Sequence, residues 1–410
     1  MMNTRSKVRK TQDPLKYLYK QVSRFEYNQE STDSGALIGS NDDIITEILL
    51  RLPAKSILRF KCVSKHWLSL LSHQCFTLRY DKVLKSPGLF YDSSYIPFDD
   101  GEDRTTPPCS GLVDHNIQVV QSCNGLLLCR GNPGDEYAFV YSVLNPTTKQ
   151  FTIIPPIHGR RKDRRLICFM GLAYHITDCV HFKVVCIRYA KVFEDLLQVQ
   201  IYSSDTGKWK ILNESFSVPH YTFLRSGVYW KGAFHWIPSC LDPMYLNLKT
   251  NKLQKLPLPC PLPVRVEPFG GYCDGIVPFY FGESGGHLHL VAGSHLEYHL
   301  HLNVYEMLSD HSGWYIKYQV ELDELPTLYP EVIDYSRHPS HPNYYTLRMI
   351  DLVRGEEEED TFMVLRIPNK IISYNVINKS FKLILHFPDV PDNRVSYAEV
   401  HRYIKTLSLF

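Results

Sequence analysis

A strand–turn–strand unit recurs five times between residues 140 and 381 of this 410-residue chain. In each copy an apolar strand leads into a polar turn rich in Asn, Asp, Gly and Lys. A second strand then returns, with an aromatic or large aliphatic residue at or near its start. These bulky residues are Phe151, Trp209, Leu253, Trp314 and Phe381, so the unit returns about every 45 to 65 residues. Such a period is typical of repeated supersecondary structure, and it constrains the fold of most of the chain.

The repeat predicts several strands in each interval. The outgoing strands of the five units are residues 140–144, 199–203, 244–246, 302–306 and 371–376. Further strands are predicted at residues 126–129, 165–174, 180–188, 227–236, 286–291 and 361–365. Three or four strands in each interval match a β-propeller blade, in which closure of the ring removes most exposed strand edges. We therefore predict a mainly β fold with a propeller-like domain, and a two-sheet β-sandwich is the alternative.

The segment from Ser40 to Phe76 has a helical pattern instead. Its first helix is predicted from Asp42 to Leu52, and Ser40 or Asn41 can cap the free amides at its start. Pro53 suits the beginning of a second helix, and a third follows around Trp67. Three short helices in about forty residues display more apolar surface than so small a unit can bury alone. The segment is therefore predicted to bind another protein.

The residues of this segment resemble the F-box, the motif that docks substrate receptors onto the Skp-type adaptor of cullin-based (SCF) ubiquitin ligases. The resemblance rests on residues 42–45, 47–49, 51–53, 55–60, 62–65 and 67. F-boxes usually open with Leu-Pro, whereas this chain has Ser40 and Asn41, which removes a hydrophobic contact at the front edge of the interface. The resemblance assigns ten residues to the adaptor interface or the module's own core: Ile44, Ile45, Ile48, Leu49, Leu52, Pro53, Ile57, Leu58, Val63 and Trp67.

Parts of the β region resemble the F-box-associated domain of plant F-box proteins, which is kelch-like in fold. The similar pieces are residues 122–127, 183–186, 227–236, 305–307 and 314–318. The organisation that we predict is a disordered polar leader at 1–39, an F-box at 40–80, a linker or first strand at 81–115 and the β domain at 116–407.

The two resemblances imply a function. The chain would be a non-catalytic substrate receptor that binds a Skp-type adaptor and, through it, cullin and RING subunits. The β domain would recruit a protein substrate, but the sequence identifies neither that substrate nor the residues that bind it. A stand-alone propeller that binds a glycan or a small molecule, with a purely structural helical module, is the alternative.

The composition excludes several other functions. The chain has 45 Lys and Arg against 43 Asp and Glu, so the clustered positive charge of a nucleic-acid-binding protein is not expected. Its 11 cysteines form no Cys-x-x-Cys pair, which argues against a zinc framework or a disulfide scaffold. No apolar run approaches a membrane span or a signal peptide, so we expect the nucleus, the cytoplasm or both. The basic run from Arg5 to Lys10 is either a nuclear address or a basic tail.

A histidine-rich segment is the strongest candidate for a metal site. It contains His287, His289, His295, His299 and His301, with Glu297 nearby. A His-x-His pair on a strand places both imidazoles on one face, and a turn at Gly293-Ser294 would let two such pairs meet. A propeller metalloenzyme is therefore a third reading. No carboxylate or cysteine motif completes the set, so we expect a solvated or packed hairpin without metal or other cofactor.

Other catalytic signals are missing from the sequence. No Gly-x-Ser-x-Gly elbow or phosphate-binding loop occurs, and the chain is therefore not expected to be an enzyme. The acidic run from Glu356 to Asp360 stands just before a predicted strand. We interpret it as a solvated turn, although it could attract a basic substrate.

Overall fold

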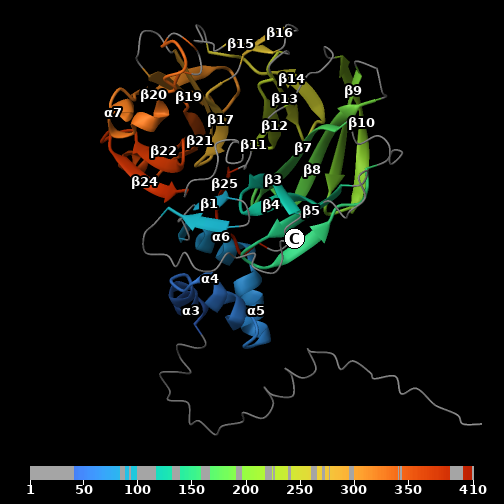
Figure 1. The fold of residues 1–410 in the computed structure, drawn as a ribbon. Coiled ribbons are helices and arrows are strands. Elements are labelled where there is room, and N and C mark those ends of the chain that lie inside the picture. The colour runs from blue at the N-terminus through green and yellow to red at the C-terminus, as the bar shows by residue number, and fades with distance from the viewer. Residues whose placement is uncertain are drawn as a thin grey trace, which may run out of the picture.

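A ring of β-sheets forms the main body of this computed structural model, and a group of short helices lies at one end of it (Figure 1). The predicted leader at 1–39 and Ser40 lie outside the described residues. The described residues are 41–83, 88–91, 94–98, 117–131, 139–157, 167–190, 196–217, 224, 227–238, 242–259, 266–269, 273–276, 278–294, 300–339, 341, 344–387 and 400–408.

Four helices make up the helical group. They are α3 (Asp42–Leu49), α4 (Ala54–Phe60), α5 (Lys65–Ser72) and α6 (Gln74–Val83). Asn41 caps α3 as the sequence predicts, because its Oδ1 accepts hydrogen bonds from the amides of Asp43 (3.0 Å) and Ile44 (3.1 Å). Pro53 stands at the N-cap of α4, and Ser64 Oγ accepts a bond from the Trp67 amide at 3.1 Å. The third helix thus begins at Lys65, and α6 was not predicted.

Five four-stranded antiparallel sheets follow, each in simple chain order. The first is β3 (Ile117–Cys123), β4 (Leu126–Gly131), β5 (Val140–Asn145) and β6 (Gln150–Ile153). The second is β7 (Ile167–His175), β8 (Cys179–Tyr189), β9 (Leu196–Ser203) and β10 (Lys208–Ser217). The third is β11 (Val228–Trp230), β12 (Ala233–Trp236), β13 (Met244–Asn247) and β14 (Lys252–Lys255). The fourth is β17 (Tyr280–Ser284), β18 (His287–Ser294), β19 (His301–Met307) and β20 (Trp314–Glu321). The fifth is β21 (Arg348–Val353), β22 (Phe362–Ile367), β23 (Lys370–Asn375) and β24 (Phe381–His386).

The five predicted hairpins are the outer two strands of these five sheets, and the pairings confirm all of them. Three of their turns share one local chemistry. Asn145, Asn247 and Asn375 each accept hydrogen bonds, through Oδ1, from the amides two and three residues later, at 2.9 to 3.3 Å. The residue four positions after each Asn has a positive φ, near 60°. The repeated polar turn is thus a short-range structure that the sequence dictates by itself.

A sixth, three-stranded sheet closes the ring. It consists of β2 (Ser94–Pro97), β1 (Gly88–Tyr91) and β25 (Val400–Tyr403), and it pairs Gly88 with Tyr403. The innermost strands contact one another in the cyclic order β25, β3, β7, β11, β17, β21 and again β25. The fold is therefore a β-propeller, as predicted, rather than a sandwich, and the structure gives it six blades.

Smaller elements lie outside the blades. They are the two-stranded pair β15 (Val266–Phe269) and β16 (Cys273–Ile276), α7 (Leu325–Leu328), and the 3-10 turns η2 (Pro330–Val332) and η3 (Glu358–Asp360). Figure 1 places β15 and β16 at the end of the molecule away from the helices.

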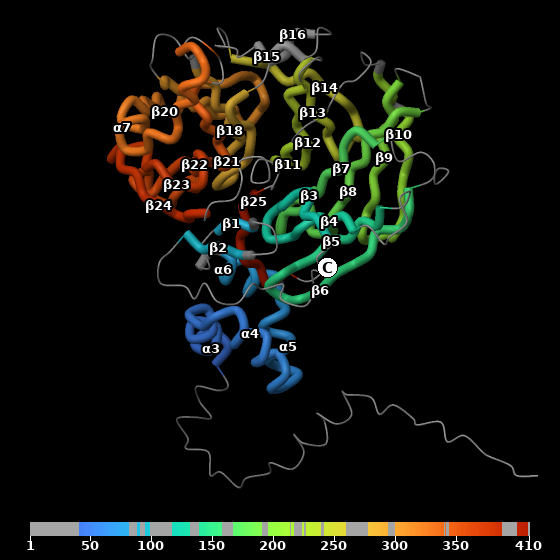
Figure 2. Tube along the Cα trace, viewed as in Figure 1, coloured from blue at the N-terminus to red at the C-terminus, as the bar shows by residue number. Residues whose placement is uncertain are grey.

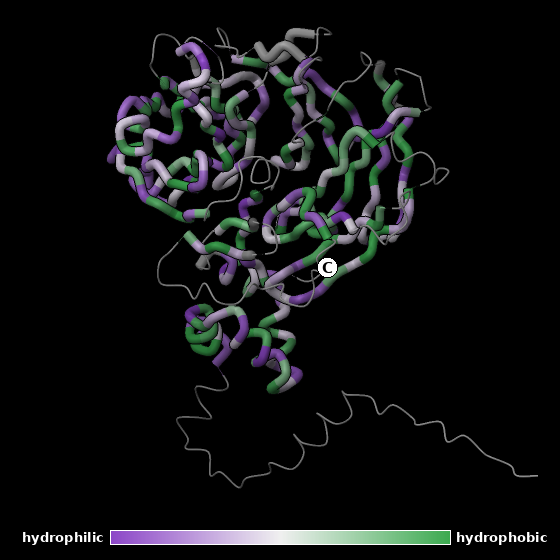
Figure 3. The backbone as a smooth tube through the Cα atoms, viewed as in Figure 1, coloured by the Kyte–Doolittle hydropathy of each residue, from purple (hydrophilic) through white to green (hydrophobic). Residues whose placement is uncertain are grey.

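The apolar core is divided among the blades. One cluster of buried side chains spans the sheets from β3 to β14, and another spans those from β17 to β24. In Figure 3 apolar segments accordingly recur in every sheet and in the helices. None of the helices within the described ranges has the length and apolarity that a membrane crossing requires.

Candidate functional site

The helical module has a small core of its own. Its buried apolar side chains are Ile45, Leu49, Leu50, Ile57, Leu71, Phe76 and Tyr80, and Leu407 from the segment after β25 packs with them. The Tyr80 hydroxyl donates to the Leu52 carbonyl at 2.6 Å, which connects α6 to the segment between α3 and α4. Three of the ten residues assigned from the sequence, Ile45, Leu49 and Ile57, lie in this core. These three are therefore placed to hold the module together.

A second set of apolar side chains faces solvent. Ile44 is 43% exposed, Ile48 48% and Val63 61%, although all are large and apolar. Ile44 and Ile48 are four residues apart on α3 and so share one helical face. Pro53 is also exposed, whereas Leu52, Leu58 and Trp67 are half-buried against the core; Phe60 meets the Trp67 ring edge-on.

Leu68 extends this exposed set, and the sequence reasoning missed it. Its side chain is 47% exposed on α5. Trp67, Leu70 and Leu71 form the stripe of α5 that packs inward. An apolar residue beside the buried stripe of a helix is the sequence signal that would have identified Leu68.

Two polar contacts cross the module at its surface. His66 Nε2 lies 2.7 Å from Asp42 Oδ1, which connects the beginnings of α5 and α3. Arg79 of α6 forms an ion pair with Glu47 of α3. All four side chains are about half exposed. Exposed pairs of this kind contribute at most about 1 kcal/mol each, so the stability of the module depends on its apolar core.

The histidine-rich segment does not turn at Gly293-Ser294. β18 continues through Gly293 and Ser294, and Ser294 pairs with His301 across to β19. Because His289 pairs with Glu306 at the other end of the same ladder, His289 and His301 do not lie opposite each other. His295, Glu297 and His299 lie outside the described residues. The condition for a metal site, a turn at Gly293-Ser294, is therefore not met, since the strand extends through both residues.

His287 and His289 instead face a buried carboxylate. His287 Nδ1 lies 2.7 Å from Glu306 Oε1, and His289 Nε2 lies 3.5 Å from Glu306 Oε2. Tyr315 donates to Oε1 at 2.6 Å, and Arg354 donates to Oε2 at 2.8 Å. Burial alone would raise the pKa of Glu306, but these hydrogen bonds and positive charges hold it at about 2. The alternating histidines thus belong to a polar network around Glu306, and within the described ranges no group of three His, Cys, Asp or Glu could hold a metal.

The acidic run is exposed at a blade turn. Residues 358–360 form η3, and Glu358 makes an ion pair with Lys317 of β20. The side chains from Glu356 to Asp360 are all exposed. The solvated-turn interpretation fits this position.

Comparison with known proteins gives matches in both the helical module and the propeller. Residues 41–79 match the F-box domain, and residues 100–262 match the F-box associated beta propeller domain. An F-box protein of Arabidopsis thaliana is 30% identical over 420 residues, covering 92% of this chain and 94% of the relative. F-box only protein 8 of the same plant is 31% identical, covering 51% of this chain and 68% of the relative.

An Arabidopsis thaliana F-box/kelch-repeat protein is 29% identical, covering 53% of this chain and 65% of the relative. Among solved structures, a chain of the nidogen/laminin complex has a TM-score of 0.39 at 10% identity and covers 78% of this chain and 99% of that chain, a likeness too remote to bear on function. The near full-length relative is the informative match. This chain belongs to the plant F-box proteins that carry an F-box-associated β-propeller domain.

Proposed function

We propose that this chain is the substrate receptor of an SCF-type ubiquitin ligase. The F-box helices dock a Skp-type adaptor, which connects the chain to cullin and RING subunits. The propeller binds a protein substrate in the nucleus, the cytoplasm or both. F-box proteins generally act as adaptors without catalytic activity, and this role fits the family to which the chain belongs.

The observation that carries the proposal is the exposed apolar set on the helices, Ile44, Ile48, Val63 and Leu68. The module already has a closed core, so these side chains are not needed for its own packing. Covering them with a partner would remove apolar area from water, at about 25 cal/mol per Å². A patch of this kind on so small a module favours a protein partner.

The chemistry of ubiquitin transfer then belongs to a separate conjugating enzyme. This chain contributes position, because a substrate held on the propeller has a high effective concentration near that enzyme. No cofactor is required for such a role. The residues of the propeller that recognise the substrate are not assigned.

Capture of a purified Skp-type adaptor by the full-length chain tests the proposal. The variant Ile44→Asp with Ile48→Asp places two charges on the exposed face of α3 and should reduce capture at least roughly tenfold. Leu383→Asp is the matched control, because Leu383 is also about half exposed (47%) but lies on β24 of the propeller. The control should capture as much adaptor as the wild type.

Two results would overturn the proposal. One is a wild-type chain that fails to capture the adaptor, which would favour the stand-alone propeller that binds a glycan or a small molecule. The other is undiminished capture by the α3 variant, which would show that the exposed face of α3 is not the docking surface. Circular dichroism of each variant verifies that the chain is folded.

A further inference from the structure

The segment that follows β25 enters the core of the F-box. Leu407 has no exposed surface, and it packs in the same cluster as Ile57, Leu71 and Tyr80 of the helices. More than three hundred residues separate it from these partners along the chain. The F-box core is therefore completed by a side chain that lies C-terminal to all strands of the propeller.

Polar contacts fix the same segment to α6. The Thr406 hydroxyl donates to Asp81 Oδ2 at 2.7 Å, and the Leu407 amide lies 3.3 Å from Asp81 Oδ1. The Ser408 amide donates back to Thr406 Oγ1 at 3.1 Å, which shapes the turn that presents Leu407. One carboxylate of α6 thus receives both a side-chain and a main-chain donor.

The opposite side of the segment is fixed to the first blade. Asn145, at the end of β5, is fully buried, and its Nδ2 donates to the carbonyls of Thr406 (3.2 Å) and Ser408 (2.9 Å). Gly125 in the β3–β4 turn has a φ of +86°, and a Cβ there would lie 2.3 Å from Thr406 Cγ2. Figure 2 shows the dark red trace after β25 descending between α6 and the β5 region. The segment therefore contacts α6 on one side and the first blade on the other.

One further contact joins the two parts. Gln74, the first residue of α6, donates its Nε2 to the Ile176 carbonyl in the β7–β8 turn at 2.8 Å. The side chains of Gln74 and Asp81 therefore form the α6 side of the joint. Gln74 contacts the carbonyl of a blade turn, and Asp81 contacts the segment after β25. The helices are attached along a line of contacts rather than only through the chain between α6 and β1.

We propose that residues 404–408 form a strap that locks the F-box in one orientation against the propeller. Leu407 anchors the strap in the helical core, and Asn145 anchors it in the first blade. The orientation of the exposed α3 face relative to the blades is then fixed by the fold. The strap is defined without reference to any partner; in a substrate receptor it would set the distance between bound substrate and docked adaptor.

The strap is tested on the full-length chain, without adaptor, by single-molecule energy transfer between dyes. The dyes are attached through non-natural amino acids at two exposed positions, Lys55 on α4 and Lys252 on β14. The wild type should give one narrow distribution. Asn145→Asp keeps the Oδ1 acceptor of the β5–β6 turn but replaces the Nδ2 donor by a charge that repels the Thr406 and Ser408 carbonyls, so it should broaden the distribution.

Asn247→Asp is the matched control. Asn247 performs the same turn chemistry at the end of β13, but its Oδ1 bonds lie within its own turn, away from the strap. Its distribution should stay narrow. Leu407→Asp attacks the other anchor; it should broaden the distribution and make amide hydrogen exchange in α6 roughly tenfold faster, while exchange in β8 and β9 stays unchanged.

The outcomes separate a strap from simple packing. A broad distribution in the wild type overturns the proposal. So do narrow distributions in both Asn145→Asp and Leu407→Asp, even if α6 exchanges faster, because Leu407 would then only fill the core. Neither readout depends on adaptor capture, so the proposed function can fail while the strap survives, and the reverse.

Discussion

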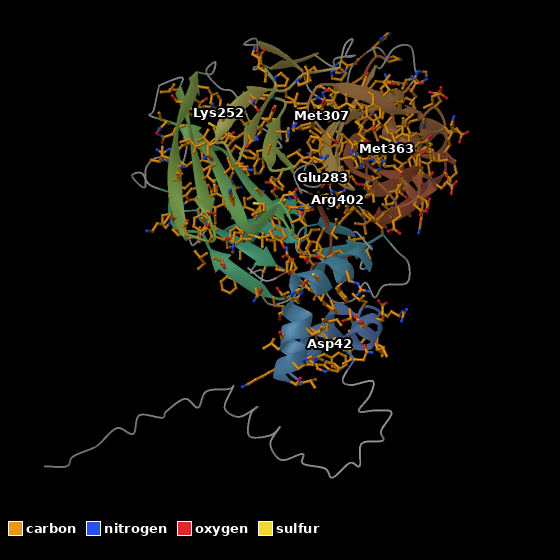
Figure 4. The ribbon with its side chains drawn as sticks, turned by 180° about the vertical axis from the view of Figure 1, so that it is seen from behind. Asp42, Lys252, Glu283, Met307, Met363 and Arg402 are labelled. Atoms are coloured by element: carbon orange, nitrogen blue, oxygen red, sulfur yellow. The ribbon has the colours of Figure 1, made fainter. Side chains whose placement is uncertain are left out.

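Arg402 of β25 places its Nε 3.4 Å from Oδ2 of Asp351 on β21. The same guanidinium lies 3.3 Å from Oε2 of Glu283, near the end of β17 (Figure 4). It also donates to Oγ of Ser284, the last residue of β17, at 2.8 Å. Burial raises the pKa of Asp351, and the charge of Arg402 opposes that rise. One side chain of the closing strand therefore connects the sixth blade to the fourth and the fifth.

Replacing Arg402 should destabilise the propeller strongly, because Arg402 is a largely buried charge with largely buried acidic partners. Arg402→Gln leaves Asp351 and Glu283 without their buried counter-charge, and breaking a buried ion pair in this way costs about 3 to 5 kcal/mol. Urea unfolding measures the loss. Arg348→Gln, at an exposed position of β21, is the control and should change stability by less than about 0.5 kcal/mol. A loss below about 1 kcal/mol at Arg402 would contradict a closing role.

The cap of α3 gives a second prediction. Asn41→Ala removes the acceptor of the Asp43 and Ile44 amides and should cost about 1 kcal/mol, seen as faster hydrogen exchange in α3. Asn41→Asp keeps the oxygen and should be close to wild type. Equal rates of hydrogen exchange in the two variants would show that the Asn41 side chain does not stabilise the start of α3.

Truncating a core residue of the F-box should reduce stability, whereas truncating a surface residue should reduce adaptor capture. Ile57→Ala removes a fully buried side chain and should cost about 2 to 5 kcal/mol in unfolding free energy. Ile48→Ala truncates a side chain that is about half exposed and should cost less than about 1 kcal/mol, yet it should weaken adaptor capture. If Ile48→Ala unfolds the chain as readily as Ile57→Ala, the division between core and docking face is incorrect.

Local chemistry explains what the sequence predicted well. The turn after Asn145 is determined by a side chain that bonds amides two and three residues away, so the pattern is readable without any tertiary information. The same holds for Asn41, whose capping bonds also span two and three residues. Pro53 at the start of α4 is a third example, because its fixed φ suits that position.

Long-range pairing explains what was missed. The inner strand β17, Tyr280–Ser284, contains Gly282 and has no clear alternation, and its place is set by neighbouring blades. The pairing of Gly88 with Tyr403 joins segments more than three hundred residues apart. Leu407 has no local signal that its partners are helices at the other end of the sequence. The choice between core and surface on α3 likewise needed the positions of α5 and α6.

A histidine pair between two blades predicts acid sensitivity. His235 of β12 is buried, with Nε2 2.9 Å from Nε2 of His311 in the β19–β20 turn. Burial and the neighbouring His311 lower the pKa of His235 from 6.5 to about 3. The unfolded chain therefore binds a proton more readily between these values, and stability is lost as pH falls through 6.5.

The expected loss between pH 7 and pH 5 is about 2 kcal/mol from this one group. His235→Gln should reduce the pH dependence by that amount, measured as unfolding free energy at each pH. Gln254→Ala, at an exposed position of β14 that carries no titratable group, should leave the slope as in the wild type. Identical slopes for wild type and His235→Gln would refute the assignment.

Asp81 in the strap contact should produce the opposite slope. Burial raises its pKa from 3.8 to about 6, although the bonds from Thr406 and Leu407 act to lower it. The folded chain therefore holds the proton more tightly than the unfolded chain, and the contribution of this group to stability falls as pH rises from about 4 through 6. Asp81→Asn carries no charge and keeps one oxygen acceptor, while its NH2 group replaces the other oxygen as a donor, much as the hydroxyl of the protonated carboxyl does. The variant should match the wild type near pH 4 and become more stable than it above pH 7, by up to about 3 kcal/mol. A stability difference between the variant and the wild type that is the same at pH 4 and pH 8 would contradict the prediction. The pKa of Asp81 would then be the same in the folded and the unfolded chain.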